Sequence, residues 1–242
     1  MAVKIVFASV CGGGTAEEAM AEYNYLLGSV EHHATMGSHV VLDTSPREYY
    51  INARGLPSSV RWVQEPLYNN GSRFRMWSAL KRVVELAESM QPDVIVHLDS
   101  DEFFSKEGSE GLFEKATKAV VEVLTFEWRE GKAYDFGTWH RRAWPGGVGV
   151  TIGLNVGWQE HPKYSGNPEE HPFPVPPAGM SITRAEGSIH HHIGMVVGQK
   201  KVFRGGADVP WWPHHQEASS VAWPMLLKKW RDEGVAPFEN FK

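Results

Sequence analysis

The first half of the chain alternates between short apolar runs and longer segments with amphipathic spacing. Apolar runs of strand length cover residues 3–10, 39–42, 60–63 and 93–98. The longest of them contain few polar positions, which is typical of strands buried on both faces of a parallel sheet. Between the strands, apolar spacing predicts a helix over 15–35, and Ser72 begins a second helix that runs to about residue 90. Strands that alternate with helices predict right-handed βαβ units and a mainly parallel sheet.

Residues that can bind a ligand or take part in catalysis follow the carboxyl ends of three of these strands. They are residues 11–14, 43–45 and 99–102. In parallel α/β sheets, ligands bind in the crevice beyond the carboxyl ends of the strands. The three segments are therefore expected to line one crevice.

The pattern changes after about residue 130. A helix is predicted from Ser109 and a strand over 120–128, but beyond them periodicity fades and Gly, Pro, Trp and His become dense. We expect one α/β domain in which residues 1–130 form the sheet. Residues 131–242 are expected to form a loop-rich half of the same domain that covers the crevice.

Composition narrows the possible functions and compartments. The net charge of −5 counts against a protein that grips nucleic acid through its phosphates. One cysteine, Cys11, excludes an intramolecular disulfide and a cysteine-based zinc cluster, so a reducing, cytoplasmic location is expected. No run approaches the roughly 20 apolar residues of a membrane span. The run at 3–10 is brief and precedes glycines, so it is interpreted as a first strand instead of a signal peptide.

The acidic segment at 99–102 has a spacing that suits a metal ion. Asp99 and Asp101 are alternate residues, and in an extended strand end alternate side chains point the same way. Two converging carboxylates repel each other unless a cation lies between them. Mn²⁺ or Mg²⁺ prefers carboxylate oxygens together with substrate phosphates. The alternative is a solvated acidic turn that caps the helix beginning at Ser109.

The run HLDSDEFF at 97–104 resembles the LDxDEF signature of GT-A-fold glycosyltransferases of the family 2-like group. Upstream, EYNYLL, EHH and MG, which fall within 22–37, resemble that group's first helix, roughly NE…YLLEW…HH…LG. VVLDTS at 40–45 is similar to its strand ending in DNGS. The order and spacing agree over about residues 3–104. Ala21 stands where the group has asparagine, and the DNGSTDGT run is shortened.

The resemblance implies a single GT-A-like, Rossmann-like domain with a metal site. Asp101 would be the principal metal ligand, Asp99 would contact the metal or the ribose, and Glu102 would support them. A late histidine would complete the metal shell, with His192 preferred and His190 second. A polar histidine cluster within a hydrogen-bond network is the alternative for these histidines.

The implied donor is a nucleoside-diphosphate sugar, with a UDP-sugar favoured. Asp43 would sit near the base or ribose, whereas an Asx-turn that closes the strand is the alternative. Arg73 can donate to the diphosphate or be solvated helix charge. Lys201, in a glycine-flanked basic stretch, is the preferred group for stabilising the leaving diphosphate. Trp211 is a candidate for the sugar or acceptor pocket, although most of the ten tryptophans are expected to build core.

The resembled group is mostly inverting, so a carboxylate must deprotonate the acceptor hydroxyl. Asp208 is the first candidate and Glu186 the second. The acceptor is a glycan or a modified nucleic-acid base, although the acidic charge does not favour the latter. Two other functions stay open: a nucleotidyltransferase with a similar sheet, and a carbohydrate-binding protein without catalysis.

Overall fold

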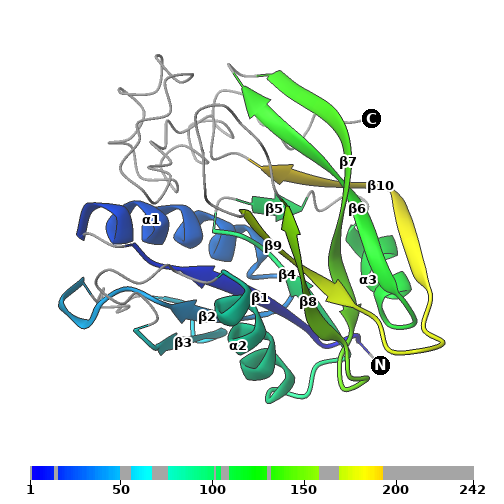
Figure 1. Cartoon of the computed structure of the whole chain (residues 1–242), viewed down its shortest axis with the longest axis horizontal. Coiled ribbons are helices and arrows are strands. Elements are labelled where there is room, and N and C mark those ends of the chain that lie inside the picture. Colours follow the sequence, from blue (N-terminus) through cyan, green and yellow to red (C-terminus); the bar gives the residue numbers. More distant parts are fainter. Residues whose placement is uncertain are drawn as a thin grey trace.

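The computed structural model describes residues 2–13, 16–49, 56–66, 76–100, 102–104, 109–129, 132–157 and 169–192. Within them, eight strands form one sheet in the order β3-β2-β1-β4-β7-β6-β10-β5 (Figure 1). The strands are β1 (Ile5–Cys11), β2 (Ser38–Asp43), β3 (Val60–Gln64), β4 (Val94–His97), β5 (Glu102–Phe104), β6 (Val120–Arg129), β7 (Lys132–Pro145) and β10 (Ile182–His192). The predicted α/β class with a mainly parallel sheet is confirmed.

The connections of the sheet reverse direction next to β1. This strand pairs in parallel with β2 on one side and with β4 on the other, and β2 pairs in parallel with β3. The chain therefore moves outward from β1 to β3 and then crosses back to β4. The gap between the carboxyl ends of β1 and β4 is a topological switch point, where open α/β sheets bind ligands.

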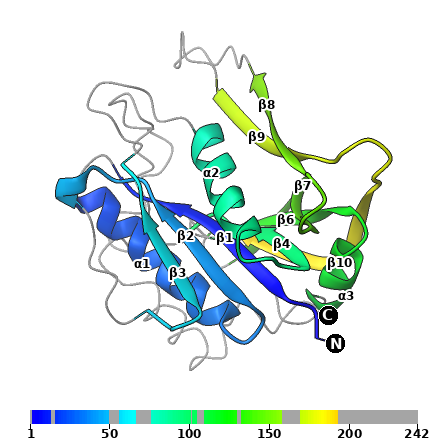
Figure 2. The same ribbon diagram turned by 90° about the horizontal axis from the view of Figure 1, so that it is seen from below.

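Helices cover both faces of the sheet. Helix α1 (Ala16–His33) and helix α3 (Ser109–Ala116) cover the face that carries Ile5 and Phe7, and helix α2 (Met76–Glu88) covers the face that carries Val6. Figures 1 and 2 show α1 and α2 on opposite sides of β1 and β2. A short 3-10 helix, η1 (Arg47–Tyr49), follows β2. No helix in the described part of the chain is long and apolar enough to cross a membrane.

Four strands lie in a stretch where the sequence predicted loops. Besides β7 and β10, an antiparallel pair, β8 (Thr151–Gly157) and β9 (Glu169–Val175), packs on α2, and the Trp77 indole donates to the Ile152 carbonyl at 2.7 Å. Strand β7 lies between β4 and β6, and residues 142–145 in it are all buried. A buried strand that contains an arginine shows neither polar–apolar alternation nor a continuous apolar run, so periodicity missed it.

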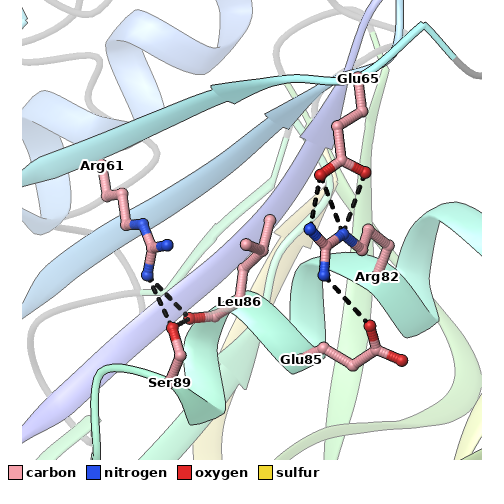
Figure 3. A network of polar contacts seen from close by, with 6 residues as sticks. All are labelled: Arg61, Glu65, Arg82, Glu85, Leu86 and Ser89. Atoms are coloured by element: carbon pink, nitrogen blue, oxygen red, sulfur yellow. Dashed lines mark hydrogen bonds and ion pairs between the residues drawn. The ribbon is translucent and has the colours of Figure 1, made fainter.

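A polar network ties the edge strand β3 to α2 (Figure 3). Arg82 donates to both oxygens of Glu65 at 2.6 to 3.0 Å and to Glu85 at 3.3 Å. Arg61 donates to Ser89 at 2.7 Å. These groups are partly exposed, so they orient the edge of the sheet and contribute little to its stability.

Candidate functional site

The acidic segment forms a closed turn between β4 and β5. The Glu102 amide donates to the Asp99 carbonyl at 3.1 Å, and the Asp99 amide donates to Glu102 Oε2 at 2.8 Å. The Glu102 side chain is 2% exposed, whereas that of Asp99 is 38% exposed. The alternative of a solvated acidic turn therefore does not hold for Glu102, and of the two described carboxylates Asp99 is the one that faces outward.

A buried arginine from the middle of the sheet neutralises part of this segment. Arg142 in β7 places Nη2 at 2.5 Å from Glu102 Oε1 and at 3.3 Å from Asp99 Oδ2, with its side chain 8% exposed. A charge removed from water costs several kcal/mol unless a close partner offsets it, and Glu102 is such a partner. Sequence reasoning missed Arg142, because its role follows only from the position of β7 beside β4.

His97 completes the contacts that orient Asp99. Arg142 Nη1 donates to His97 Nδ1 at 2.8 Å, and because a guanidinium is always a donor, Nδ1 must be the accepting nitrogen. The proton of the neutral ring is then on Nε2, which lies 3.4 Å from Asp99 Oδ1. Asp99 therefore accepts a hydrogen bond from Arg142 of β7 on one oxygen, and the His97 ring of β4 lies beside the other oxygen without a hydrogen bond to it.

The histidine run is brought beside the acidic turn by strand pairing. Strand β10 pairs antiparallel with β5, with His190 opposite Phe104 and His192 opposite Glu102. Strand β10 runs through His192, so the backbone is extended at both histidines. Two signals about ninety residues apart in the sequence therefore meet on adjacent strands.

Asp43 closes the loop after β2, as in the alternative that the sequence analysis gave for this residue. This residue is 1% exposed; its Oδ1 accepts from the Ser45 amide at 3.0 Å, and its Oδ2 accepts from Gln64 at 3.3 Å. The bond from the Ser45 amide forms an Asx-turn, and the bond from Gln64 links this turn to β3. The contact of Asp43 with a nucleotide stays a prediction.

The end of β1 packs closely against this turn. Gly12 has a φ of +130°, and a Cβ atom there would lie 2.8 Å from the backbone nitrogen of Ser45. Burial, with smaller contributions from Asp43 and Glu22, raises the pKa of the Cys11 thiol. The thiol therefore stays protonated, which argues against a nucleophilic role.

Several predicted site residues lie outside the described part of the chain: Arg73, Asp101, Lys201, Asp208 and Trp211. Glu186, His190 and His192 lie in β10, but their side chains are not described. Among the side chains that are described, no group of three or more His, Cys, Asp and Glu residues is arranged to hold a metal ion. The side chains predicted to bind the metal, those of Asp101, His190 and His192, are not among the described ones.

No protein-family model and no curated protein matches the sequence. Similar solved structures include a mannose-1-phosphate geranyltransferase from Thermus thermophilus, with 14% identity, 64% of this chain and 47% of that chain covered, and a TM-score of 0.37. S. aureus TarS 1-349 matches with 16% identity, coverages of 51% and 36%, and a TM-score of 0.33. Another S. aureus TarS structure matches with 12% identity, 59% of this chain and 28% of that chain covered, and a TM-score of 0.36. The chain spans less than half the length of each, and TM-scores this low carry no argument about function.

Charged side chains from several elements meet at the acidic turn. Among the described side chains, the guanidinium of Arg142 contacts Asp99 and Glu102, and Glu22 accepts a hydrogen bond from the Ser100 hydroxyl. Three carboxylates, Asp99, Glu102 and Glu22, therefore lie in or beside this turn. Carboxylates that converge in this way repel one another, and an added cation relieves the repulsion. Carboxylate oxygens are the ligands that hard cations prefer in proteins.

Proposed function

We propose that this chain is a metal-dependent glycosyltransferase. It would move a sugar from a nucleoside-diphosphate sugar, with a UDP-sugar favoured, to an acceptor hydroxyl with inversion. The observation that carries the proposal is the pairing of β10 with β5, which brings His190 and His192 alongside the acidic turn. This turn follows β4, the strand that borders the switch point of the sheet.

The metal that we propose for this site is Mn²⁺ or Mg²⁺. Asp101 would be the principal ligand, with His192 or His190 from β10, because oxygen and imidazole ligands suit Mn²⁺. Asp99 already faces Arg142 and His97, so we assign it to the ribose or to a weaker metal contact. When bound, the metal supplies positive charge that stabilises a departing diphosphate.

The remaining donor contacts follow the topology of the sheet. The turn after β2, which contains Asp43, and the glycines after β1 lie at the same edge of the sheet as the acidic turn. We propose that the base and ribose lie along this edge. Arg73 and Lys201 would donate to the diphosphate and offset the charge that develops on it.

The acceptor side rests on residues later in the chain. Asp208, or Glu186 in its place, would take the proton from the acceptor hydroxyl, and Trp211 would pack against a sugar face. A glycan is the favoured acceptor, with a modified nucleic-acid base second. A cytoplasmic location remains part of the proposal, on the ground of the single cysteine.

The test is a panel of sugar nucleotides with Mn²⁺, scored for donor hydrolysis and for protection from thermal unfolding. We expect the wild-type chain to respond to at least one donor and Asp101→Ala to lose the response. Glu114→Ala is the control, because Glu114 is exposed on α3 and outside the site, and it should behave as the wild type.

The outcomes separate the competing functions. Release of pyrophosphate from a nucleoside triphosphate and a sugar phosphate would identify a nucleotidyltransferase instead. Sugar binding without any effect of nucleotide or metal would identify a carbohydrate-binding protein. No response to any donor, with Asp101→Ala identical to the wild type, would reject the proposal.

A further inference from the structure

We propose that helix α1 positions the acidic turn, with Glu22 and His33 as positioning residues. The inference rests on the proposed function, because it concerns the same metal and donor site. It goes beyond that function by adding residues that lie about seventy positions earlier in the sequence and are not proposed to touch metal or substrate.

Strand β5 forms an edge of the sheet. This strand has three residues, lies at the end of the sheet order and pairs with β10. On its other side it meets α1, as Figure 1 shows. Backbone groups at a sheet edge need hydrogen-bond partners when they are buried, and Glu102 and Phe104 are both buried.

Side chains of α1 supply these partners in place of another strand. His33 Nε2 accepts from the Phe104 amide at 3.0 Å, and His32 Nε2 lies 2.7 Å from the Phe104 carbonyl. Ser29 Oγ donates to the Glu102 carbonyl at 2.8 Å. The strand that follows the acidic turn is thus held on the helix side by three consecutive polar contacts.

The tautomer of His33 is determined by its two contacts. Because Nε2 accepts an amide proton, the ring proton lies on Nδ1, which donates to the Ser29 carbonyl at 2.7 Å. The ring is fully buried and packs against Phe7 with ring centroids 4.7 Å apart. A side chain held in this way has one orientation, so it transmits the position of α1 to β5.

Helix α1 also contacts the acidic turn itself. Glu22 accepts a hydrogen bond from the Ser100 hydroxyl, and Ser100 lies between the two aspartates of the motif and is buried. Residues 22, 29 and 33 are spaced by seven and four positions, so they share one face of the helix. That face therefore holds the turn at Ser100 and the strand immediately after it.

This arrangement has a physical purpose at a site that gathers carboxylates. Carboxylates without a cation between them push the turn apart, so a rigid support is needed for them to converge on a metal. Partners that orient ligands in this way typically change metal affinity by about 10- to 100-fold when they are removed. The helix face supplies such a support from outside the turn.

The experiment compares two matched substitutions at each residue. Glu22→Gln and His33→Gln keep an acceptor, whereas Glu22→Leu and His33→Leu remove it at similar size. Mn²⁺ affinity is measured by titration with Mn²⁺ alone and with Mn²⁺ plus UDP. We expect the leucine variants to bind Mn²⁺ roughly 10- to 100-fold more weakly and the glutamine variants to stay close to the wild type.

Two further variants serve as controls. Glu31→Leu is the control for Glu22→Leu, because Glu31 is exposed on the same helix, and it should leave Mn²⁺ affinity unchanged. Ser29→Ala removes one hydrogen bond to β5 with little change in volume. If His33→Leu does not fold, Ser29→Ala decides the matter, and an unchanged Mn²⁺ affinity in it overturns the proposal.

The remaining outcomes distinguish this inference from the proposed function. If the wild type binds Mn²⁺ and UDP, and folded leucine variants bind equally well, the positioning role is wrong and the proposed function stands. If Glu22→Gln is as weak as Glu22→Leu, Glu22 acts through its charge and not by positioning. If the wild type binds neither Mn²⁺ nor UDP, both proposals fail together.

Discussion

Replacing His39 with leucine is expected to remove part of the acid sensitivity of the fold. The residue lies in β2, is 1% exposed and stacks on Phe7 with ring centroids 4.8 Å apart. Neither ring nitrogen has a hydrogen-bond partner among the described residues. A protonated imidazole in this position would be a buried charge without compensation. Burial accordingly lowers the pKa of His39 from 6.5 to about 3.

The sign and size of the effect follow from proton binding in the two states. At pH values well above 6.5 neither state binds the proton, so His39 adds almost no pH dependence there. Below 6.5 the unfolded chain takes up a proton that the folded chain excludes until the pH reaches about 3. Stability therefore falls as the pH falls, by at most about 1.4 kcal/mol per pH unit. Between pH 7 and pH 5 the loss integrates to about 2 kcal/mol.

The assay is urea unfolding of the wild type and His39→Leu at pH 8, 7 and 5. Leucine has no titratable group, so between pH 7 and pH 5 the variant should lose about 2 kcal/mol less of its free energy of unfolding than the wild type. Between pH 8 and pH 7 the two chains should change in parallel, which serves as the internal control. Equal losses for both proteins between pH 7 and pH 5 would refute the assignment of a buried, neutral His39.

Three further predictions concern other parts of the structure. Arg142→Leu leaves the buried carboxylate of Glu102 without its counter-charge and should lower the free energy of unfolding in urea by about 3 kcal/mol or more; a loss below about 1 kcal/mol would contradict the buried ion pair. Gly12→Ala should lower the free energy of unfolding by more than about 1 kcal/mol, because φ is +130° and the new Cβ would lie 2.8 Å from the Ser45 nitrogen. An unchanged thermal unfolding curve would exclude this geometry. Arg82→Met should lower the free energy of unfolding by less than about 1 kcal/mol, because the pair with Glu65 is partly exposed. The difference in stability between the wild type and this variant should shrink in 1 M salt.

Local patterns in the sequence determined most of the first half of the fold. Each of the strands β1 to β4 is a short apolar run, and α1 has its apolar positions on one face, so the periodicity was sufficient to identify them. The βαβ order then placed residues 11, 43 and 99 at one edge of the sheet, as the pairings confirm. Helix α3 and strand β6 were also predicted close to their observed positions.

The sequence could not show which distant segments meet. Strand β7 enters the middle of the sheet between β4 and β6, and only this placement brings Arg142 to Glu102 and His97. A buried charged residue looks like a surface residue in a pattern of apolar and polar positions, because its partner is remote in the chain. The same limit applies to His33, whose bond to Phe104 exists only once α1 has packed beside β5.

For the candidate site, the sequence predicted the chemistry from residue types, and the tertiary structure decided which residues lie together. Residue types and spacing at 97–104 were enough to predict carboxylates for a cation, since that depends on neighbours in the chain. The pairing of β10 with β5, the counter-charge of Arg142 and the contacts from α1 all depend on strand order and helix packing. Those are long-range contacts, formed only when the whole sheet assembles, and no local pattern encodes them.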